Sequence, residues 1–454
     1  MTGEDVSVDS PPATDVLLWG GRAAPWVAAA VLLAALVVLL LVSTPPRADR
    51  TLSATGVQPV AARDFSPAEV ARGDALAAAT VPWSLTALAL NVVVAALLGF
   101  TPLGARLMSA VAAPFGGGPW ARLFLGGLVL LAVSRLVTLP FAVVVLSRRR
   151  AVGLVTQSWG GWLIDVAKAF ALSALVVLVV AALVRLVVLA LPRAWWVVVA
   201  VGAAGLVVAL SFAYPLVVEP IFNRFTPMPD GTLRTSLLAL AEKDGLPVRD
   251  VLVADASRRT TALNAYVSGL GSSRRIVVYD TLLKQAPADQ VRSVVAHELG
   301  HVKNNDVRDG TLVGALGAAA MACLLAAMLV SPAVQSRSGF SGPSDPRALA
   351  FALALVVVVT TLAGPVTNVV SRRIEARADL HALDLTGDPA ALVEVQHRLA
   401  VTNVSDVTPS AVLYALFATH PSAPERIALA RTWARQRGVA EPADLVGPAG
   451  RAGR

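Results

Sequence analysis

Residues 168–191, KAFALSALVVLVVAALVRLVVLAL, contain only two charged side chains. About 20 consecutive apolar residues are enough for a helix to cross the hydrocarbon core of a bilayer. This stretch therefore predicts a transmembrane helix. Six other stretches approach it in length and apolar character, and they lie at residues 25–43, 82–103, 120–146, 195–218, 310–330 and 348–370. The sequence predicts a predominantly α-helical, polytopic membrane protein with seven transmembrane helices.

The composition of the whole chain supports this class. Of 454 residues, 56% are hydrophobic and 15% are charged, whereas soluble domains carry about 25% charged residues. Disordered, collagen-like and coiled-coil proteins are thereby excluded. The single cysteine, Cys323, excludes a disulfide framework and a zinc site built from cysteines. The net charge of +8 is spread along the chain without interleaved aromatic residues, so we expect no nucleic-acid partner.

Basic residues in the short loops determine the predicted orientation, because cytoplasmic loops carry an excess of Lys and Arg. Loops on one side carry Arg47, Arg50, Arg63, Arg72, Arg148, Arg149 and Arg150. Loops on the other side carry Arg22, Arg106, Arg193, Arg337 and Arg347. We therefore expect the N-terminus outside and the C-terminus in the cytoplasm.

Two long polar segments interrupt the apolar pattern and divide the chain into four parts. Residues 1–218 form an N-terminal membrane region with five spans, and residues 310–370 contain two more. Residues 219–309 and 371–454 are the polar segments, both expected in the cytoplasm. The first predicts a helix over 230–245, strands at 250–254, 264–269 and 275–279, and a helix over 287–304.

Residues 297–301 read HELGH. Positions i and i+4 share one face of a helix, so His297 and His301 can present their imidazoles to the same metal ion. Glu298 stands beside the first imidazole and can reach a water on the metal without binding the metal itself. This is the pattern of zinc proteases, in which the glutamate takes a proton from the activated water and later donates it to the leaving amine.

Such a site needs a third protein ligand and an open fourth position. His381, His397, His420 and several carboxylates are candidates. Glu375 and Asp379 are again four residues apart on a predicted helix, so one could bind the metal while the other accepts a hydrogen bond from a ligand histidine. A solvated charged helix face would give a similar pattern.

Several motifs together resemble one protein family. They are FTPMPD (225–230), DASRRT (255–260), NAY (264–266), RIV (275–277), DTLL (280–283), HELGH (297–301), SRRIEARAD (371–379), THP (419–421) and ER (425–426). In this order, over roughly residues 60–430, the chain resembles the type 1 CAAX prenyl proteases of the sterile-24 type. These are integral-membrane zinc endopeptidases whose seven helices enclose a water-filled chamber. The resemblance implies a gluzincin-type metalloprotease domain with a small β-sheet.

The resemblance also implies roles for individual residues. The ligands of one zinc ion would be His297, His301 and Glu375, with Glu298 as general base. Asp379 would bind the free N–H of a ligand histidine.

The resemblance further implies how substrate binds. A strand carrying Asn264, Ala265 and Tyr266 would be an exposed edge that binds the substrate as an added strand. His420 would contact the substrate and the tetrahedral oxyanion, with Arg426 nearby, although a histidine before a proline is also typical of a helix entry. Peptides, prenylated peptides and membrane lipid are the expected partners.

Two intramembrane arginines and the natural substrate allow more than one interpretation. Arg135 and Arg185 lie inside apolar stretches and would line the chamber, or Arg185 could extend to the interface. The richness in Ala, Val and Arg is typical of a bacterial protein from a high-GC genome, so the protease activity is a firmer expectation than the prenylated substrate. Alternatives are an HtpX-like quality-control protease, which would have about four spans, and a transporter with a structural zinc site. The oligomeric state is left open.

Overall fold

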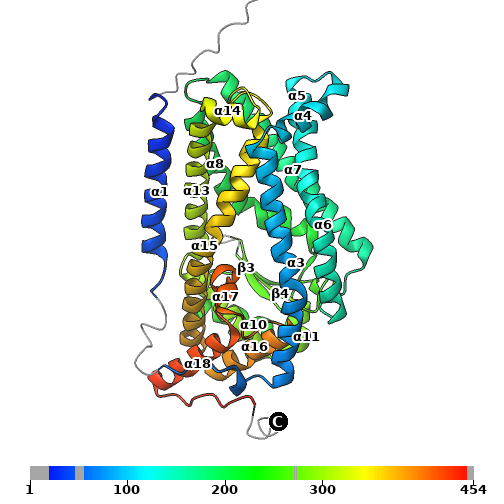
Figure 1. Cartoon of the computed structure of the whole chain (residues 1–454). Helices are drawn as coiled ribbons and strands as arrows, with labels where there is room; N and C mark the ends of the chain where they lie inside the picture. Colours follow the sequence, from blue (N-terminus) through cyan, green and yellow to red (C-terminus); the bar gives the residue numbers. More distant parts are fainter. Residues whose placement is uncertain (1–19, 47–55, 270, 272–273, 447–454) are drawn as a thin grey trace, which may run out of the picture.

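The computed structural model describes residues 20–46, 56–269, 271 and 274–446 (Figure 1). Long helices run through most of the length of the molecule, whereas the β-sheet and several short helices gather toward one end. Arg47 and Arg50, on which the expected orientation partly depends, lie outside the described residues.

Seven helices within the described residues are long and apolar enough to cross a membrane, as the sequence predicts. They are α1 (Ala24–Ser43), α3 (Pro67–Phe100), the composite helix Pro119–Ala151, α7 (Trp159–Ala190), the composite helix Trp195–Phe222, α13 (Asp306–Leu329) and α15 (Ala348–Thr386). The first composite helix joins α5 (Pro119–Ala121), the π-helical turn η3 (Arg122–Gly126) and α6 (Gly127–Ala151). The second joins α8 (Trp195–Ala213), the π-helical turn η4 (Tyr214–Val218) and α9 (Glu219–Phe222).

Two of these helices extend well beyond their apolar stretches. The helix α3 begins at Pro67 because Ser66 and Glu69 form a capping box, in which each side chain satisfies the other's backbone N–H. The helix α15 continues past residue 370 to Thr386 and ends at Gly387, whose φ of 67° favours glycine. The expected boundaries at 309/310 and 370/371 therefore fall inside the continuous helices α13 and α15.

The sheet has four strands in the order β1-β2-β4-β3. The central strands β2 (Asp250–Ala254) and β4 (Arg275–Tyr279) are parallel, and both have the predicted bounds. The strand β3 (Ala265–Ser268) pairs antiparallel with β4 and forms one edge of the sheet. The strand β1 (Phe225–Pro227), which the sequence analysis does not predict, pairs with β2 at the other edge.

Short helices cover the sheet and build the core of the polar part. The predicted helices correspond to α10 (Thr232–Lys243) and α12 (Ala288–Lys303). Leu237, Ile276, Val295 and Leu392 are buried in one shared core. The other helices of the polar part are η5 (Ala256–Arg258), α11 (Asp280–Gln285), α16 (Pro389–Thr402), α17 (Ala411–Phe417) and α18 (Ala423–Arg437). Three more helices lie at the opposite end of the bundle (Figure 1): α4 (Leu103–Ala112), η2 (Ala113–Phe115) and α14 (Pro332–Ser338).

A buried ion pair joins the N-terminal membrane region to the C-terminal segment. Asp64 follows the short helix η1 (Ala61–Arg63), and both its oxygens accept hydrogen bonds from Arg431 of α18 at 2.7 and 2.5 Å. The two residues are 2% and 1% exposed, so neither charge is solvated. Removing one partner of such a pair is costly because the other charge remains buried without compensation.

We therefore expect Asp64→Asn to lower the free energy of unfolding by about 3–5 kcal/mol, measured by thermal unfolding of the detergent-purified protein. Arg435→Gln is the matched control, because Arg435 pairs with Glu441 on the surface, and such pairs contribute about 1 kcal/mol or less. Equal stability of the two variants would contradict a structural role for the buried pair.

Candidate active site

The helix α12 carries the HELGH sequence into the interior of the protein. Val291, Val295 and Leu299 are fully buried and fix one face of the helix in the core. His297 and His301 then lie one turn apart on the adjoining face, with His297 only 7% exposed. A Cβ atom at Gly300 would lie 3.2 Å from the Cα atom of Ala378, so glycine allows α12 to approach α15 closely.

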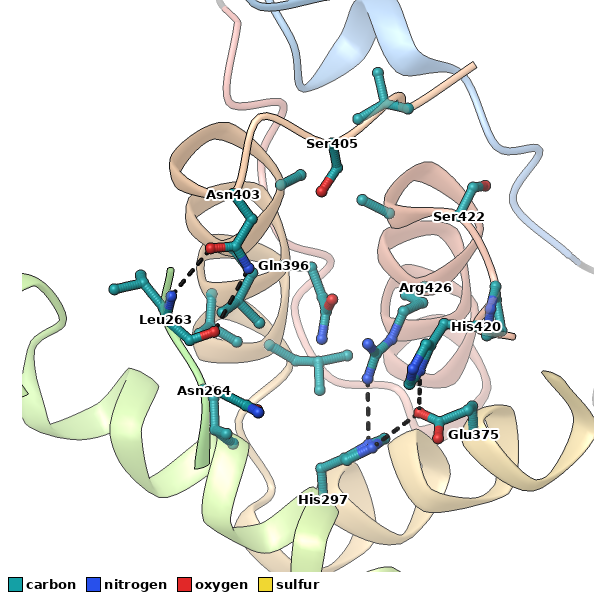
Figure 2. A pocket seen from close by; sticks show the side chains of 18 of the residues that line it. Leu263, Asn264, His297, Glu375, Gln396, Asn403, Ser405, His420, Ser422 and Arg426 are labelled. Atoms are coloured by element: carbon teal, nitrogen blue, oxygen red, sulfur yellow. Dashed lines mark hydrogen bonds and ion pairs between the residues drawn. The ribbon is translucent and has the colours of Figure 1, made fainter. Parts of the chain in front are cut away.

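This close approach brings Glu375 of α15 to the two imidazoles, and Figure 2 shows it beside His297. The two Nε2 atoms are 3.2 Å apart, Glu375 Oε2 lies 3.2 Å from His297 Nε2, and Glu375 Oε1 lies 3.7 Å from His301 Nε2. Donors bound at 2.0–2.1 Å around a tetrahedral ion lie about 3.3–3.4 Å apart. The two imidazoles and the carboxylate of Glu375 are therefore close enough to one another to bind a single tetrahedral divalent metal together.

Each imidazole is oriented by a carboxylate at its other nitrogen. His297 Nδ1 lies 2.9 Å from Asp379, which is completely buried, and His301 Nδ1 lies 2.9 Å from Asp306. Because each Nδ1–H can donate to its carboxylate, both Nε2 lone pairs are directed toward the space between the histidines. Asp306 is itself paired with Arg377 of α15.

Arg426 of α18 completes the buried network. Its guanidinium donates to both oxygens of Asp379, at 2.7 and 2.5 Å, and it also lies 3.2 Å from His297 Nδ1. Burial by itself lowers the pKa of His297, but the hydrogen bonds of Asp379 and Glu375 outweigh this effect and raise the pKa to about 9. Metal binding therefore has to release that proton.

Glu298 lies beside the two histidines without occupying the position of Glu375. One of its carboxylate oxygens is within 4.8 Å of an imidazole nitrogen of each histidine. Burial raises the pKa of Glu298, although the charges of His297 and His301 oppose the shift. A carboxylate with a raised pKa binds a proton more readily, which is the property that a general base requires.

A cavity of about 560 Å³ opens over these residues. His420, between α17 and α18, stands at its rim with 59% of its side chain exposed, and its Nδ1 lies 2.8 Å from Glu375 (Figure 2). Ala265 and Tyr266 of the edge strand β3 line the cavity, as does Asn264 directly before the strand. Arg426 also lines it.

The side chain of Asn403, at the end of α16, restricts where a further strand can pair with the edge strand β3. Its Oδ1 accepts a hydrogen bond from Leu263 N at 3.0 Å, and its Nδ2 donates to Leu263 O at 3.5 Å (Figure 2). The backbone just before β3 is therefore already paired, and a further strand can add only beyond this point.

The structure brings together all the residues singled out for the site, but the remaining histidines lie elsewhere. His381 pairs with Asp244 and His397 with Glu69, so neither reaches the cluster. Sequence reasoning missed Asp306, Gly300 and Asn403. Asp306 lies only five residues after His301, and this short separation is the one signal that could have identified it.

Together, seven candidate membrane helices and a His-Glu-His cluster in a cavity beside an edge strand define a membrane-embedded metalloprotease. Two family models match consecutive parts of the chain. "CAAX prenyl protease N-terminal, five membrane helices" matches residues 50–224, and "Peptidase family M48" matches residues 227–434. The chain belongs to the type 1 CAAX prenyl protease family of M48 peptidases.

Individual relatives agree with this membership. The chain is 31% identical over 306 residues to an uncharacterized metalloprotease, YhfN, of Bacillus subtilis, covering 66% of this chain and 71% of that protein. It is 34% identical over 236 residues to a CAAX prenyl protease 1 homolog of Oryza sativa, and this match spans about half the length of each protein, 49% and 53%. The crystal structure of S. mikatae Ste24p has the same fold, with a TM-score of 0.71 at 22% identity over 89% of this chain and 98% of that one.

The carboxylate of Asp306 leads to a prediction about metal affinity. Because it orients His301, we expect Asp306→Asn to weaken binding of a divalent metal about 10- to 100-fold, measured by competition with a chelator. Asp309→Asn is the matched control, since Asp309 lies in the same first turn of α13 and pairs with the exposed Arg308. If both variants bind metal as tightly as the unaltered protein, Asp306 has no such role.

Proposed function

We propose that the protein is a zinc-dependent endopeptidase that hydrolyses peptide bonds of membrane-associated or prenylated, CAAX-type peptides. The observation that carries this proposal is the cluster of two imidazole nitrogens and the carboxylate of Glu375, with distances of 3.2–3.7 Å between the groups, directly beside Glu298. Two imidazoles and a carboxylate with an open position favour zinc over harder cations. A single ion would be held by His297, His301 and Glu375.

When bound, zinc lowers the pKa of a water and polarises the scissile carbonyl. The residues of the chain would supply the remaining steps. Glu298 takes the proton of the attacking water on its carboxylate and later donates it to the leaving amine. Asp379 and Asp306 keep the imidazoles in place while the charge on the reacting group develops.

His420 would stabilise the transition state. Its Nδ1–H donates to Glu375, so the doubly protonated imidazolium form of His420 would present Nε2–H as a donor at the rim of the cavity. A donor directed at the developing oxyanion lowers the barrier because the charge it binds is absent in the ground state. Arg426 would act mainly through Asp379, with which it makes two hydrogen bonds, and contact with the substrate remains a prediction.

The substrate would bind as an added strand along β3. Support comes from the position of β3 at the edge of the sheet and from Asn264, Ala265 and Tyr266, which line the cavity. Main-chain hydrogen bonds would hold the peptide, so its sequence would matter less than its extended conformation. The relatives named as CAAX prenyl proteases support a prenylated peptide as the substrate. The membrane helices are equally consistent with other membrane-associated peptides as substrates.

We also propose a bacterial cell membrane as the location, on the basis of the Ala-, Val- and Arg-rich composition, with the N-terminus outside. Replacing Cys323, the single cysteine, by alanine allows new cysteines to be labelled one at a time. We expect a membrane-impermeant maleimide to label Ser336→Cys, after α13, in intact cells. It should label Arg437→Cys, at the end of α18, only in inside-out vesicles, and the reverse pattern would contradict this orientation.

The decisive experiment compares cleavage of one peptide with and without a farnesyl group on its cysteine, by the full-length protein in detergent. We expect Glu298→Gln to retain zinc, measured by elemental analysis, yet to lose about 100- to 10,000-fold in rate because the general base is absent. Asp289→Asn, in the exposed first turn of the same helix, is the control and should remain active.

The two peptides separate the substrate classes. Cleavage of the farnesylated form alone would support prenyl-peptide processing. Equal, Glu298-dependent cleavage of both would support a general membrane-associated endopeptidase, as in the HtpX-like alternative. Full activity of Glu298→Gln would contradict the proposed mechanism.

A further inference from the structure

A second cavity lies among α3, α6 and α7, away from the candidate active site. Its volume is about 460 Å³, and none of its lining residues also lines the active-site cavity. All three helices belong to candidate membrane spans (Figure 1). The cavity is therefore lined by membrane helices and is separate from the site described above.

Arg135 lines this cavity from the middle of a span. It is 16 residues from each end of the composite helix Pro119–Ala151, which corresponds to about 24 Å of helix in either direction. Arginine keeps its charge at physiological pH, and a charge at this depth is rare unless it serves a ligand, an ion path or a partner. The side chain is half-buried.

Within the described part of the chain, the guanidinium of Arg135 has no recorded hydrogen bond or ion pair. Two other arginines of the spans are bonded to backbone carbonyls. Arg185 donates to Ser344 O and lies over the ring of Trp120, and Arg150 donates to Gln157 O. Arg135 thus carries five unused N–H donors toward a cavity.

The lining of the cavity contains both hydrogen-bond donors and apolar side chains. Ser134 donates to the Oδ1 atom of Asn91 at 2.5 Å, so both N–H groups of that amide remain for a ligand. Ser173 adds a hydroxyl group, and no carboxylate is among the described residues that line the cavity. The apolar wall is formed by Leu88, Leu131 and Phe170, with Ala87, Ala169 and Ala174.

We propose that this cavity binds an amphiphile with an anionic head group. Its phosphate or carboxylate is held by Arg135 and Asn91, and its hydrocarbon chain lies against Leu131 and Phe170. A planar guanidinium matches such oxygen pairs bidentately, and the absence of any lining carboxylate removes repulsion of the anion. The proposal is independent of the peptidase reaction, because the two cavities share no residue.

Native mass spectrometry of the full-length protein, purified in a neutral detergent, tests this proposal. The probes are phosphatidylglycerol, oleate, phosphatidylcholine and inorganic phosphate. We expect one molecule of phosphatidylglycerol or oleate to bind, with affinity at least about tenfold weaker in Arg135→Gln, because losing even one charge-assisted hydrogen bond costs about this factor. Phosphatidylcholine and inorganic phosphate should bind much more weakly. Tighter binding of phosphatidylglycerol would identify a phosphate as the preferred head group, and tighter binding of oleate a carboxylate.

Two further variants keep the result interpretable. Arg148→Gln removes the same charge from an exposed position at the end of the same helix and should retain full binding. Arg135→Lys keeps the charge and should bind better than Arg135→Gln. Equal binding of phosphatidylglycerol by Arg135→Gln and Arg148→Gln, or binding of inorganic phosphate as tight as that of the amphiphiles, would overturn the proposal.

Discussion

Asp379 is completely buried and accepts hydrogen bonds from both His297 and Arg426. A carboxylate removed from water in this way is tolerated only when it is paired and hydrogen bonded. The resulting network joins α12, α15 and α18, which are far apart in the sequence. Glu375 lies one turn earlier on α15 and is thereby held beside the two imidazoles. The geometry of the whole candidate site depends on this buried carboxylate.

The continuity of α15 connects that network to the membrane. Its 39 residues form one helix of about 58 Å, with an apolar part followed by the turns that carry Glu375 and Asp379. The helix is uninterrupted although it contains Pro365, so the position of the site is tied directly to the apolar part of α15. The edge strand β3 faces the same cavity, and a peptide anchored in the membrane could reach both.

Much of this arrangement was predictable, for reasons that differ from element to element. The seven spans follow from unbroken apolar length, and β2 and β4 from short apolar runs, because both signals are local. His297 and His301 follow from helical spacing within five residues. The four-residue spacing of Glu375 and Asp379 made Glu375 only one of several candidates for the third metal ligand. The family resemblance favoured it over His381 and His397. The remaining parts of the site depend on contacts between distant segments.

The sequence by itself determined the membrane class, the seven spans and the helix that carries HELGH, since hydropathy and helical period act over neighbouring residues. Only the tertiary structure decided that Asp306 orients His301 and that Arg426 pairs with Asp379. The same holds for Asn403, which blocks the backbone before β3. A side chain at a helix end can face many partners, and packing of helices such as α12 against α15 at Gly300 selects among them. Local pattern specifies elements, whereas close packing and the pairing of buried charge specify the site.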